Sequence, residues 1–186
     1  PLRLVGSEMC IRDSPLDEGQ KVTCFGIDFD ILRVPGHTLD HIAYYASGES
    51  PRKPILFSGD TLFAGGCGRL FEGSTAQMYR SLQTLSALPD DTEVYCAHEY
   101  TLANLRFALA VEPHNPDLKQ RWDDDSATRA TDTPTVPSSL ALEKRTNPFI
   151  RTGIPSVASA ATARIDIANP PEEAIFAALR KWKDQF

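Results

Sequence analysis

The sequence ILFSGDTL, residues 55–62, places an acidic side chain directly after a short apolar run. An apolar run of this length that ends at glycine is typical of a buried strand, so we predict a strand at residues 54–58. Asp60 then lies at the end of that strand, where a carboxylate needs a cation, hydrogen bonds or solvent. We therefore predict that this sheet edge carries a functional site. The alternative role for Asp60 is a cap for the turn or helix that begins at Thr61.

Two histidines follow strand-like runs in the same way. His37 comes after Val-Pro-Gly, and His98 comes after Val-Tyr-Cys-Ala. Because imidazole and carboxylate groups are common ligands of divalent metals, we predict that His37, Asp60 and His98 bind metal. The alternative for His98 is a helix-capping role. His41 is predicted to hydrogen-bond within the fold, because on a loop followed by a strand the rings of His37 and His41 need not point the same way.

The remaining pattern divides the chain into a β-rich part that ends near His98 and a helical part after it. Apolar alternation and turn residues predict strands at 22–25, 29–34, 41–46, 54–58 and 93–97. Helices are predicted from Ser74 to about residue 88, at 100–111 and from Asn169 to the end, because apolar residues lie on one face of each. Another helix is predicted from Asn115 onward, because Pro116 stands where the first helical residue would be. Residues 134–139 are predicted to be a Pro/Ser/Thr linker.

Composition excludes several classes of protein. The chain has 186 residues, which allows one domain or two small ones, and its net charge of −6 argues against general binding to nucleic acid or anionic membranes. No apolar run approaches the length of a membrane-spanning helix. The four cysteines are widely spaced, so we predict reduced thiols and a cytoplasmic location.

The first fourteen residues fit poorly with the rest. The run EMCIRDS at residues 8–14 back-translates to a transposase-end sequence that is used in DNA library preparation. We therefore predict that residues 1–14 are a non-native leader. The alternative is a genuine, irregular N-terminal arm.

Taken together, several motifs resemble those of the hydroxyacylglutathione hydrolases (glyoxalase II), which have the metallo-β-lactamase fold. The motifs are VPGHT at 34–38, GDTLFAGGCGR at 59–69, CAHEYT at 96–101, TNPF at 146–149 and RKWKD at 180–184. The resemblance implies an α+β chain. Residues 15–98 would form the second half of an αββα metallo-β-lactamase sandwich, and residues 99–186 would form a helical glutathione-binding domain.

The resemblance also implies a role for each motif. His37 would bind one metal ion, His98 would bind a second, and Asp60 would bridge the two. Glutathione would contact Arg69, Phe71, Tyr100, Arg180 and Lys183, although Phe71 stands where some members have a tyrosine. The implied reaction is hydrolysis of an S-(2-hydroxyacyl)glutathione such as S-lactoylglutathione by a metal-bound hydroxide, in methylglyoxal detoxification. The two ions would be divalent, with zinc preferred and iron or manganese also suited to such ligands. The implied protein is a monomer.

One motif of that family, T-H-x-H-x-D-H, does not occur in the sequence. Each metal would then have one histidine and a shared aspartate, whereas catalytic zinc usually takes about three protein ligands. This motivates the hypothesis that the 186-residue chain alone is inactive and poor in metal. Two other functions stay open: another enzyme of the same fold, such as a persulfide dioxygenase or a lactonase, or a non-catalytic glutathione-binding module.

Overall fold

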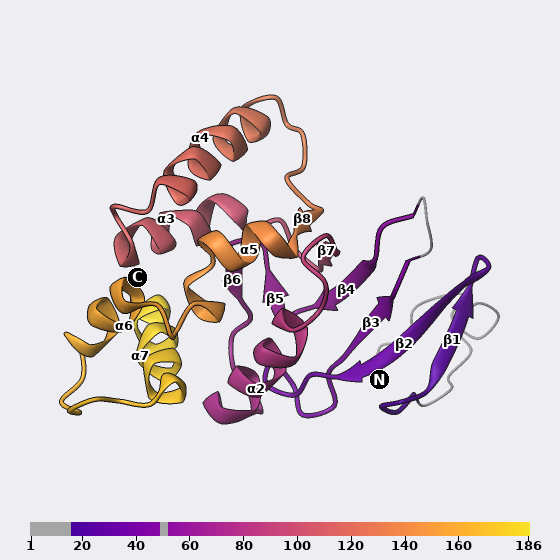
Figure 1. The fold of residues 1–186 in the computed structure, drawn as a ribbon, viewed down its shortest axis with the longest axis horizontal. Coiled ribbons are helices and arrows are strands. Elements are labelled where there is room, and N and C mark those ends of the chain that lie inside the picture. Colours follow the sequence, from indigo (N-terminus) through magenta and orange to yellow (C-terminus); the bar gives the residue numbers. More distant parts are fainter. Residues whose placement is uncertain (1–15, 49–51) are drawn as a thin grey trace, which may run out of the picture.

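The computed structural model describes residues 16–48 and 52–186. It contains a mixed six-stranded sheet, and most of its helices follow the long strands in the sequence and pack beside the sheet (Figure 1). The predicted leader and Cys10 lie outside the described residues. The order across the sheet is β1-β2-β3-β4-β7-β8. The strands are β1 (Lys21–Cys24), β2 (Ile27–Arg33), β3 (Ile42–Ala46), β4 (Ile55–Gly59), β7 (Glu93–Cys96) and β8 (Ser138–Ser139). All neighbours are antiparallel except β4 and β7.

The predicted hairpin and the three later strands of the β-rich part are confirmed, with small shifts at their ends. The hairpin turn is tighter than expected. Only Phe25 and Gly26 separate the two strands, and both have positive φ, at 52° and 74°. This is the geometry of a two-residue turn that matches the twist of the flanking strands. Ile27 and Asp28, which were expected in the turn, therefore belong to β2.

Helix α2 (Thr75–Ser86) connects the parallel strands β4 and β7 and covers one face of the sheet. It begins where the sequence predicted. Ser74 caps it by accepting a hydrogen bond from the Gln77 backbone amide, and the Gln77 side chain accepts one from the Ser74 amide. This reciprocal pair satisfies two amides that the first helical turn leaves without partners. The buried stripe of α2 contains Met78, Leu82 and Leu85, as expected.

The second part of the chain is helical, as predicted. Its elements are α3 (Thr101–Val111), α4 (Pro116–Ala130), α5 (Leu140–Thr146), the 3-10 helix η1 (Pro148–Ile150), α6 (Pro155–Thr162) and α7 (Glu172–Gln185). One predicted start was wrong: α7 has Pro171 at its N-cap, and Asn169 stands before it with a positive φ of 49°. The short elements β8, α5, η1 and α6 were not predicted. Among the described residues, no helix has the length and hydropathy that a membrane crossing needs.

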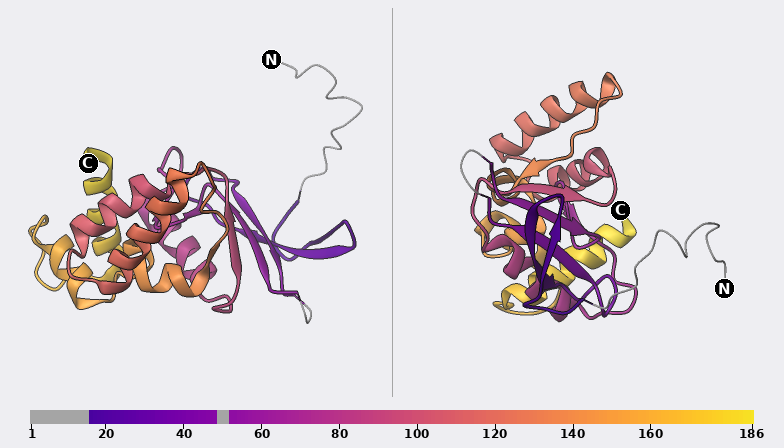
Figure 2. Two further views of the ribbon diagram at one scale, coloured as in Figure 1. Left: turned by 90° about the horizontal axis from the view of Figure 1, so that it is seen from above. Right: turned by 90° about the vertical axis from the view of Figure 1, so that its right-hand side faces the viewer.

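One core joins the two parts. It contains Leu56 and Val94 from the sheet, Leu82 from α2, Phe107 from α3 and Phe176 from α7, all buried. The opposite face of the sheet carries Tyr44, Phe57 and Tyr95 in register, and the Phe57 side chain is 43% exposed. Figure 2 shows the β1–β2 hairpin projecting at the end of the molecule away from α6 and α7.

Candidate metal and substrate site

All eight residues that the sequence singled out line the same cleft, which has a volume of about 530 Å³. The eight are His37, Asp60, Arg69, Phe71, His98, Tyr100, Arg180 and Lys183. Sequence reasoning did not predict five further residues that line the cleft, which are Phe63, Cys67, Gly68, Ala103 and Asn104. The cleft is formed by loops at the ends of the strands, by the start of α3 and by α7.

His37 is held by a hydrogen bond to backbone. Its Nδ1 lies 2.8 Å from the carbonyl oxygen of Arg69. A carbonyl can only accept, so Nδ1 donates, and the neutral ring leaves the Nε2 lone pair free. A ring fixed in this way through one nitrogen is typical of a metal-binding histidine. The ring of Phe71 packs against His37, with centroids 4.8 Å apart.

Asp60 and His98 lie together on the other side of the cleft. His98 Nε2 is 3.4 Å from Asp60 Oδ1, and both side chains are partly open to solvent. The Asp60 backbone amide donates to His41 Nε2 at 2.9 Å, so the prediction that His41 bonds within the fold is confirmed. This contact explains Gly59. Its φ is +54°, and a Cβ there would lie 2.5 Å from His41 Nε2.

A short two-stranded hairpin lies between these groups. It consists of β5 (Leu62–Phe63) and β6 (Gly66–Cys67), which the sequence analysis did not resolve. At its first strand, the Phe63 ring stacks on His98 with centroids 6.2 Å apart. After its second strand, Gly68 lies against the backbone oxygen of Asp60, so closely that a Cβ could not fit. The hairpin and the two residues that follow it, Gly68 and Arg69, therefore contact all three predicted metal ligands.

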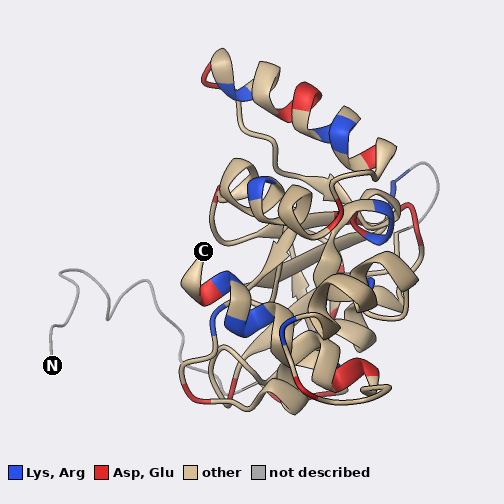
Figure 3. Cartoon of the chain, turned by 90° about the vertical axis from the view of Figure 1, so that its left-hand side faces the viewer, with Lys and Arg blue, Asp and Glu red and all other residues tan. Residues whose placement is uncertain are grey.

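Helix α7 brings basic groups to the cleft, and Figure 3 shows them on the turns near the C-terminus. Arg180 is 4% exposed and donates to the Cys67 carbonyl at 3.1 Å and to Asp184 at 2.9 Å. No described residue accepts from Arg180 Nε, although this atom is buried. Asp184 also lies 3.7 Å from the Arg69 guanidinium, so it links the two arginines across the cleft.

Lys183 is the second basic group of α7. Its Nζ donates to the Ala103 carbonyl at 3.0 Å and lies 5.1 Å from the centre of the Phe107 ring. Burial first, and then the nearby charge of Arg180, lower the pKa of Lys183 to about 8. Lys183 is thus still mainly protonated at neutral pH, but it loses its charge within reach of mildly alkaline conditions.

The donor atoms present fit divalent metals in kind, because they are two imidazoles and one carboxylate. They do not form a complete shell. Among residues 16–48 and 52–186, no three His, Cys, Asp or Glu side chains converge on one point where an ion could be held. Asp60 and His98 form a pair, and His37 comes from another loop of the same cleft. The described residues therefore place three metal-type side chains in one cleft without a complete set of ligands.

The chain matches two family models that meet at residue 98. Residues 11–98 match the metallo-beta-lactamase superfamily, and residues 99–186 match the hydroxyacylglutathione hydrolase C-terminus. Two solved structures share the fold, each with a TM-score of 0.51. A metallo-beta-lactamase from Staphylococcus aureus is 22% identical, and the match covers 89% of this chain and 42% of that one. ETHE1 from Myxococcus xanthus is 26% identical, and the match covers 90% and 58%. The fold and the cleft thus define a member of the metallo-β-lactamase superfamily.

Curated relatives narrow this class further. A hydroxyacylglutathione hydrolase of Pseudomonas putida strain W619 is 55% identical over 175 residues, which are 94% of this chain and 67% of the relative. One from Pseudomonas aeruginosa strain PAO1 is 54% identical over the same shares. The chain therefore belongs to the hydroxyacylglutathione hydrolase family. Because the chain belongs to this family of hydrolases and to the metallo-β-lactamase superfamily, it is expected to use divalent metal ions.

Proposed function

We propose that this chain takes part in the hydrolysis of S-(2-hydroxyacyl)glutathione thioesters, such as S-lactoylglutathione, to glutathione and a 2-hydroxy acid. The observation that supports this most is that one cleft is lined both by the metal-type side chains and by the basic groups of α7 and Arg69. We call the first group the metal end and the second the basic end. A glutathione thioester likewise combines a reactive acyl-sulfur bond with a glycine carboxylate.

The basic end is suited to that carboxylate. Arg180 Nε is buried and has no acceptor in the part of the chain that the structure describes. Lys183 carries a partly desolvated ammonium group, and the Arg69 side chain is 67% exposed. Hydrogen bonds between such cations and a carboxylate are among the stronger ones in proteins. Tyr100 and Phe71 would flank the ligand between the two ends, and Phe71 would contribute packing without a hydroxyl group.

The metal end would use His37 for one ion and His98 for another, with Asp60 between them. Bound divalent ions, zinc first and iron or manganese as alternatives, would acidify a water molecule and stabilise negative charge on the thioester carbonyl oxygen. The chain's own contribution is orientation. The Arg69 carbonyl holds the His37 ring, and the His41 ring holds the backbone at Asp60.

We further propose a division of labour along the chain. Residues 15–98 would carry the metal-type side chains, and residues 99–186 would carry most contacts to glutathione. We propose a monomer in the cytoplasm that acts in methylglyoxal detoxification. The match to the hydroxyacylglutathione hydrolase C-terminus supports this function over a lactonase or persulfide dioxygenase, since the basic groups of α7 lie within that match.

Calorimetric titration with two ligands tests the substrate end. Glutathione is compared with its monoethyl ester, in which the glycine carboxylate is blocked. We expect one-to-one binding of glutathione and at least about tenfold weaker binding of the ester, because a charge-assisted hydrogen bond contributes about 1.5–3 kcal/mol. Arg129→Ala serves as a matched control, because Arg129 lies on α4, does not line the cleft and pairs with Asp132. Equal affinity for both ligands would contradict the proposed carboxylate site.

A turnover assay tests the metal end separately. The chain is incubated with zinc and S-lactoylglutathione, and thioester loss is followed against a control with zinc alone. Because the described residues supply only part of a metal centre, we expect no hydrolysis by this chain above the control. Hydrolysis above the control would show that the ligands present are sufficient.

A further inference from the structure

The β5–β6 hairpin contacts the site on one side and the helical part on the other. Toward the site it carries Phe63, which stacks on His98, and it leads directly into Arg69, whose carbonyl fixes His37. Its turn, Ala64 and Gly65, does not line the cleft, and residues 63–66 are all buried. Buried backbone groups need partners, and the two-residue strands cannot pair all of them.

Side chains from the helical part supply those partners. Asn104 of α3 donates to the Ala64 carbonyl at 3.1 Å. Glu143 of α5 accepts from the Gly65 amide at 2.8 Å. Asn147, which follows α5, donates to the Phe63 and Gly66 carbonyls at 3.3 and 2.9 Å. The four consecutive residues 63–66 are thus each bonded by a side chain that lies at least 40 positions later in the sequence. We call Asn104, Glu143 and Asn147 the hairpin socket.

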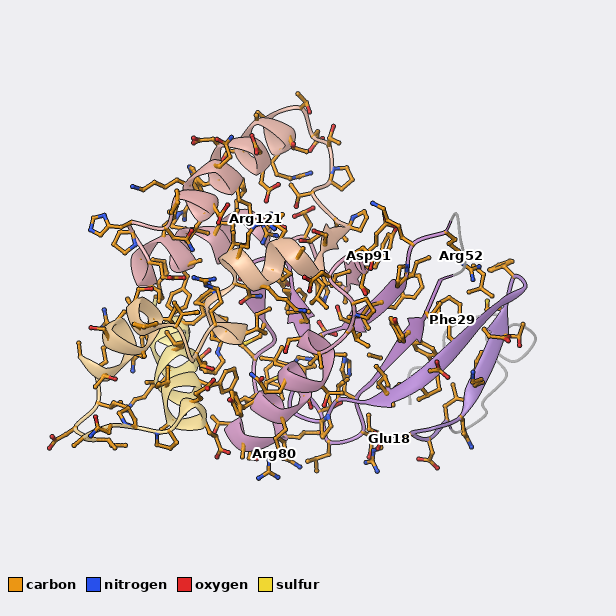
Figure 4. All side chains as sticks on the ribbon, in the orientation of Figure 1. Glu18, Phe29, Arg52, Arg80, Asp91 and Arg121 are labelled. Carbon is orange, nitrogen blue, oxygen red and sulfur yellow. The ribbon has the colours of Figure 1, made fainter. Side chains whose placement is uncertain are left out.

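Glu143 is the centre of this socket and is fully buried. Its Oε1 accepts from Arg121 at 2.7 Å and from Ser138. Its Oε2 accepts from the Gly65 amide and from Asn147 at 3.0 Å. Figure 4 labels Arg121 between α4 and α5. Oε1 of Glu143 therefore pairs with the buried Arg121 cation, and Oε2 bonds the hairpin at Gly65 and the Asn147 side chain.

We propose that the hairpin socket positions the site: through the β5–β6 hairpin, Asn104, Glu143 and Asn147 set Phe63 against His98 and the Arg69 carbonyl against His37. Glu143 and Asn147 are positioning residues, because they do not line the cleft, whereas Asn104 both lines the cleft and bonds the hairpin. The inference deepens the proposed function, since it names what holds the predicted metal ligands and Arg69 in place. It also gives the helical part a second task beside ligand binding.

The substitution Glu143→Gln tests the socket with little change of shape. The glutamine side chain has one acceptor oxygen and one donor NH2 group, whereas all four partners of Glu143 donate. The buried Arg121 guanidinium will keep the oxygen, because an unpaired buried cation is the costlier loss. The new NH2 group then faces the Gly65 amide and the Asn147 NH2 group, and the link to the hairpin is broken.

The readout is NMR of the four histidine rings and of backbone amide exchange in the metal-free chain at constant pH. In Glu143→Gln we expect the imidazole signals of His37 and His98 to shift. The Gly65 amide should exchange at least about tenfold faster, because it has lost a buried hydrogen bond. Neither readout needs metal or substrate, so a failure here is distinct from a failure of the proposed function.

Glu112→Gln is the matched control. Glu112 is also a buried glutamate with an arginine partner, Arg151, but it touches no part of the hairpin. It lies two positions before His114, so this variant should move the His114 signal and leave His37 and His98 in place. If Glu143→Gln moves His37 and His98 no more than Glu112→Gln does, the socket is only structural and the proposal is wrong.

Asn147→Asp gives a second test if Glu143→Gln does not fold. Asn147 Oδ1 caps η1 by accepting from the Phe149 amide, and an aspartate can keep that bond. An aspartate cannot donate to the Phe63 and Gly66 carbonyls. We expect the same shifts at His37 and His98. A folded Asn147→Asp chain with unchanged histidine signals would overturn the proposal.

Discussion

The β-rich part and the helical part of this molecule differ in how deeply they bury ion pairs. In the helical part, the Arg121 and Glu143 side chains are 2% and 0% exposed and form a 2.7 Å ion pair. In the β-rich part, pairs such as Lys21 with Asp30 lie in solvent. Some apolar groups show the same contrast: Phe149 and Phe107 are fully buried among helices, whereas Phe57 is 43% exposed on the open face of the sheet.

The helical part also supplies side-chain donors and acceptors to the β-rich part, as Asn104, Glu143 and Asn147 do at the β5–β6 hairpin. The β-rich part carries the metal-type side chains on loops, where the Arg69 carbonyl bonds the His37 ring and the His41 ring bonds the Asp60 amide. A rigid scaffold that supports a functional site on loops is a common arrangement in enzymes.

The largest effect is expected from the buried ion pair. Arg121→Met leaves Glu143 buried without its cation, which should lower the free energy of unfolding by about 3–5 kcal/mol. Lys21→Met, in the exposed pair of the β-rich part, should change it by less than about 1 kcal/mol. Urea denaturation of both variants measures the contrast. Similar losses in the two variants would show that the parts do not differ as described.

The next effect concerns the exposed cation of the cleft. Arg69→Ala removes a guanidinium that pairs with Asp184 and faces the proposed ligand. Because charge-assisted hydrogen bonds contribute about 1.5–3 kcal/mol, glutathione should bind about tenfold more weakly or worse. Calorimetry gives the dissociation constant, and Arg129→Ala again shows whether any loss of surface charge has the same effect. An unchanged dissociation constant for Arg69→Ala would remove this residue from the site.

A smaller effect is expected from pH. The pKa of Lys183 is lowered to about 8, so its positive charge is present below pH 8 and lost above it. The affinity for S-methylglutathione should fall by a few-fold between pH 7 and pH 9. The unfolded chain holds this proton up to a higher pH, near the ordinary lysine value of about 10.4. Lys183 therefore makes the free energy of unfolding rise with pH between about 8 and about 10.4.

Lys183→Arg is the control for this pH dependence. Arginine keeps its charge throughout the range, so the fall in affinity between pH 7 and pH 9 should shrink. If the wild-type chain and Lys183→Arg lose affinity equally, the dependence comes from another group, such as the ligand's own amine.

The smallest effect is expected on the open sheet face. Phe57→Thr replaces an exposed aromatic side chain with another residue that favours strands. Phe57 contacts Phe29 and Tyr95 at centroid distances of 5.8 and 5.3 Å, so some packing is lost. We expect a change of about 1 kcal/mol or less in the free energy of unfolding. A loss as large as that of Arg121→Met would mean that this face is covered in solution.

The sequence predicted the long elements well, because their patterns are local. The apolar stripe of α2 and its cap at Ser74 depend on residues within a short stretch of sequence. The Asn115 cap of α4 is equally local. The metal-type residues were found because each follows a strand. Short elements such as β5, β6 and β8 were missed, since two residues carry no periodicity and their order comes from tertiary contacts.

The socket could not be read from the sequence for a related reason. Glu143 and Asn147 lie about 80 positions after the turn that they bond, and a glutamate on a helix usually predicts a solvated face. Asn169 shows the opposite error. It has the composition of a helix cap, but its left-handed backbone ends the preceding turn, and α7 begins only after Pro171.

Amide chemical-shift mapping with S-methylglutathione shows where the ligand binds without requiring metal or turnover. We expect the largest shifts at Gly68 and Arg69, at Tyr100 to Asn104 and on the last turns of α7. The cleft around His114 and Arg151 serves as an internal control and should stay unchanged. An absence of shifts at saturating ligand, or shifts centred on that second cleft, would show that glutathione does not bind where we propose.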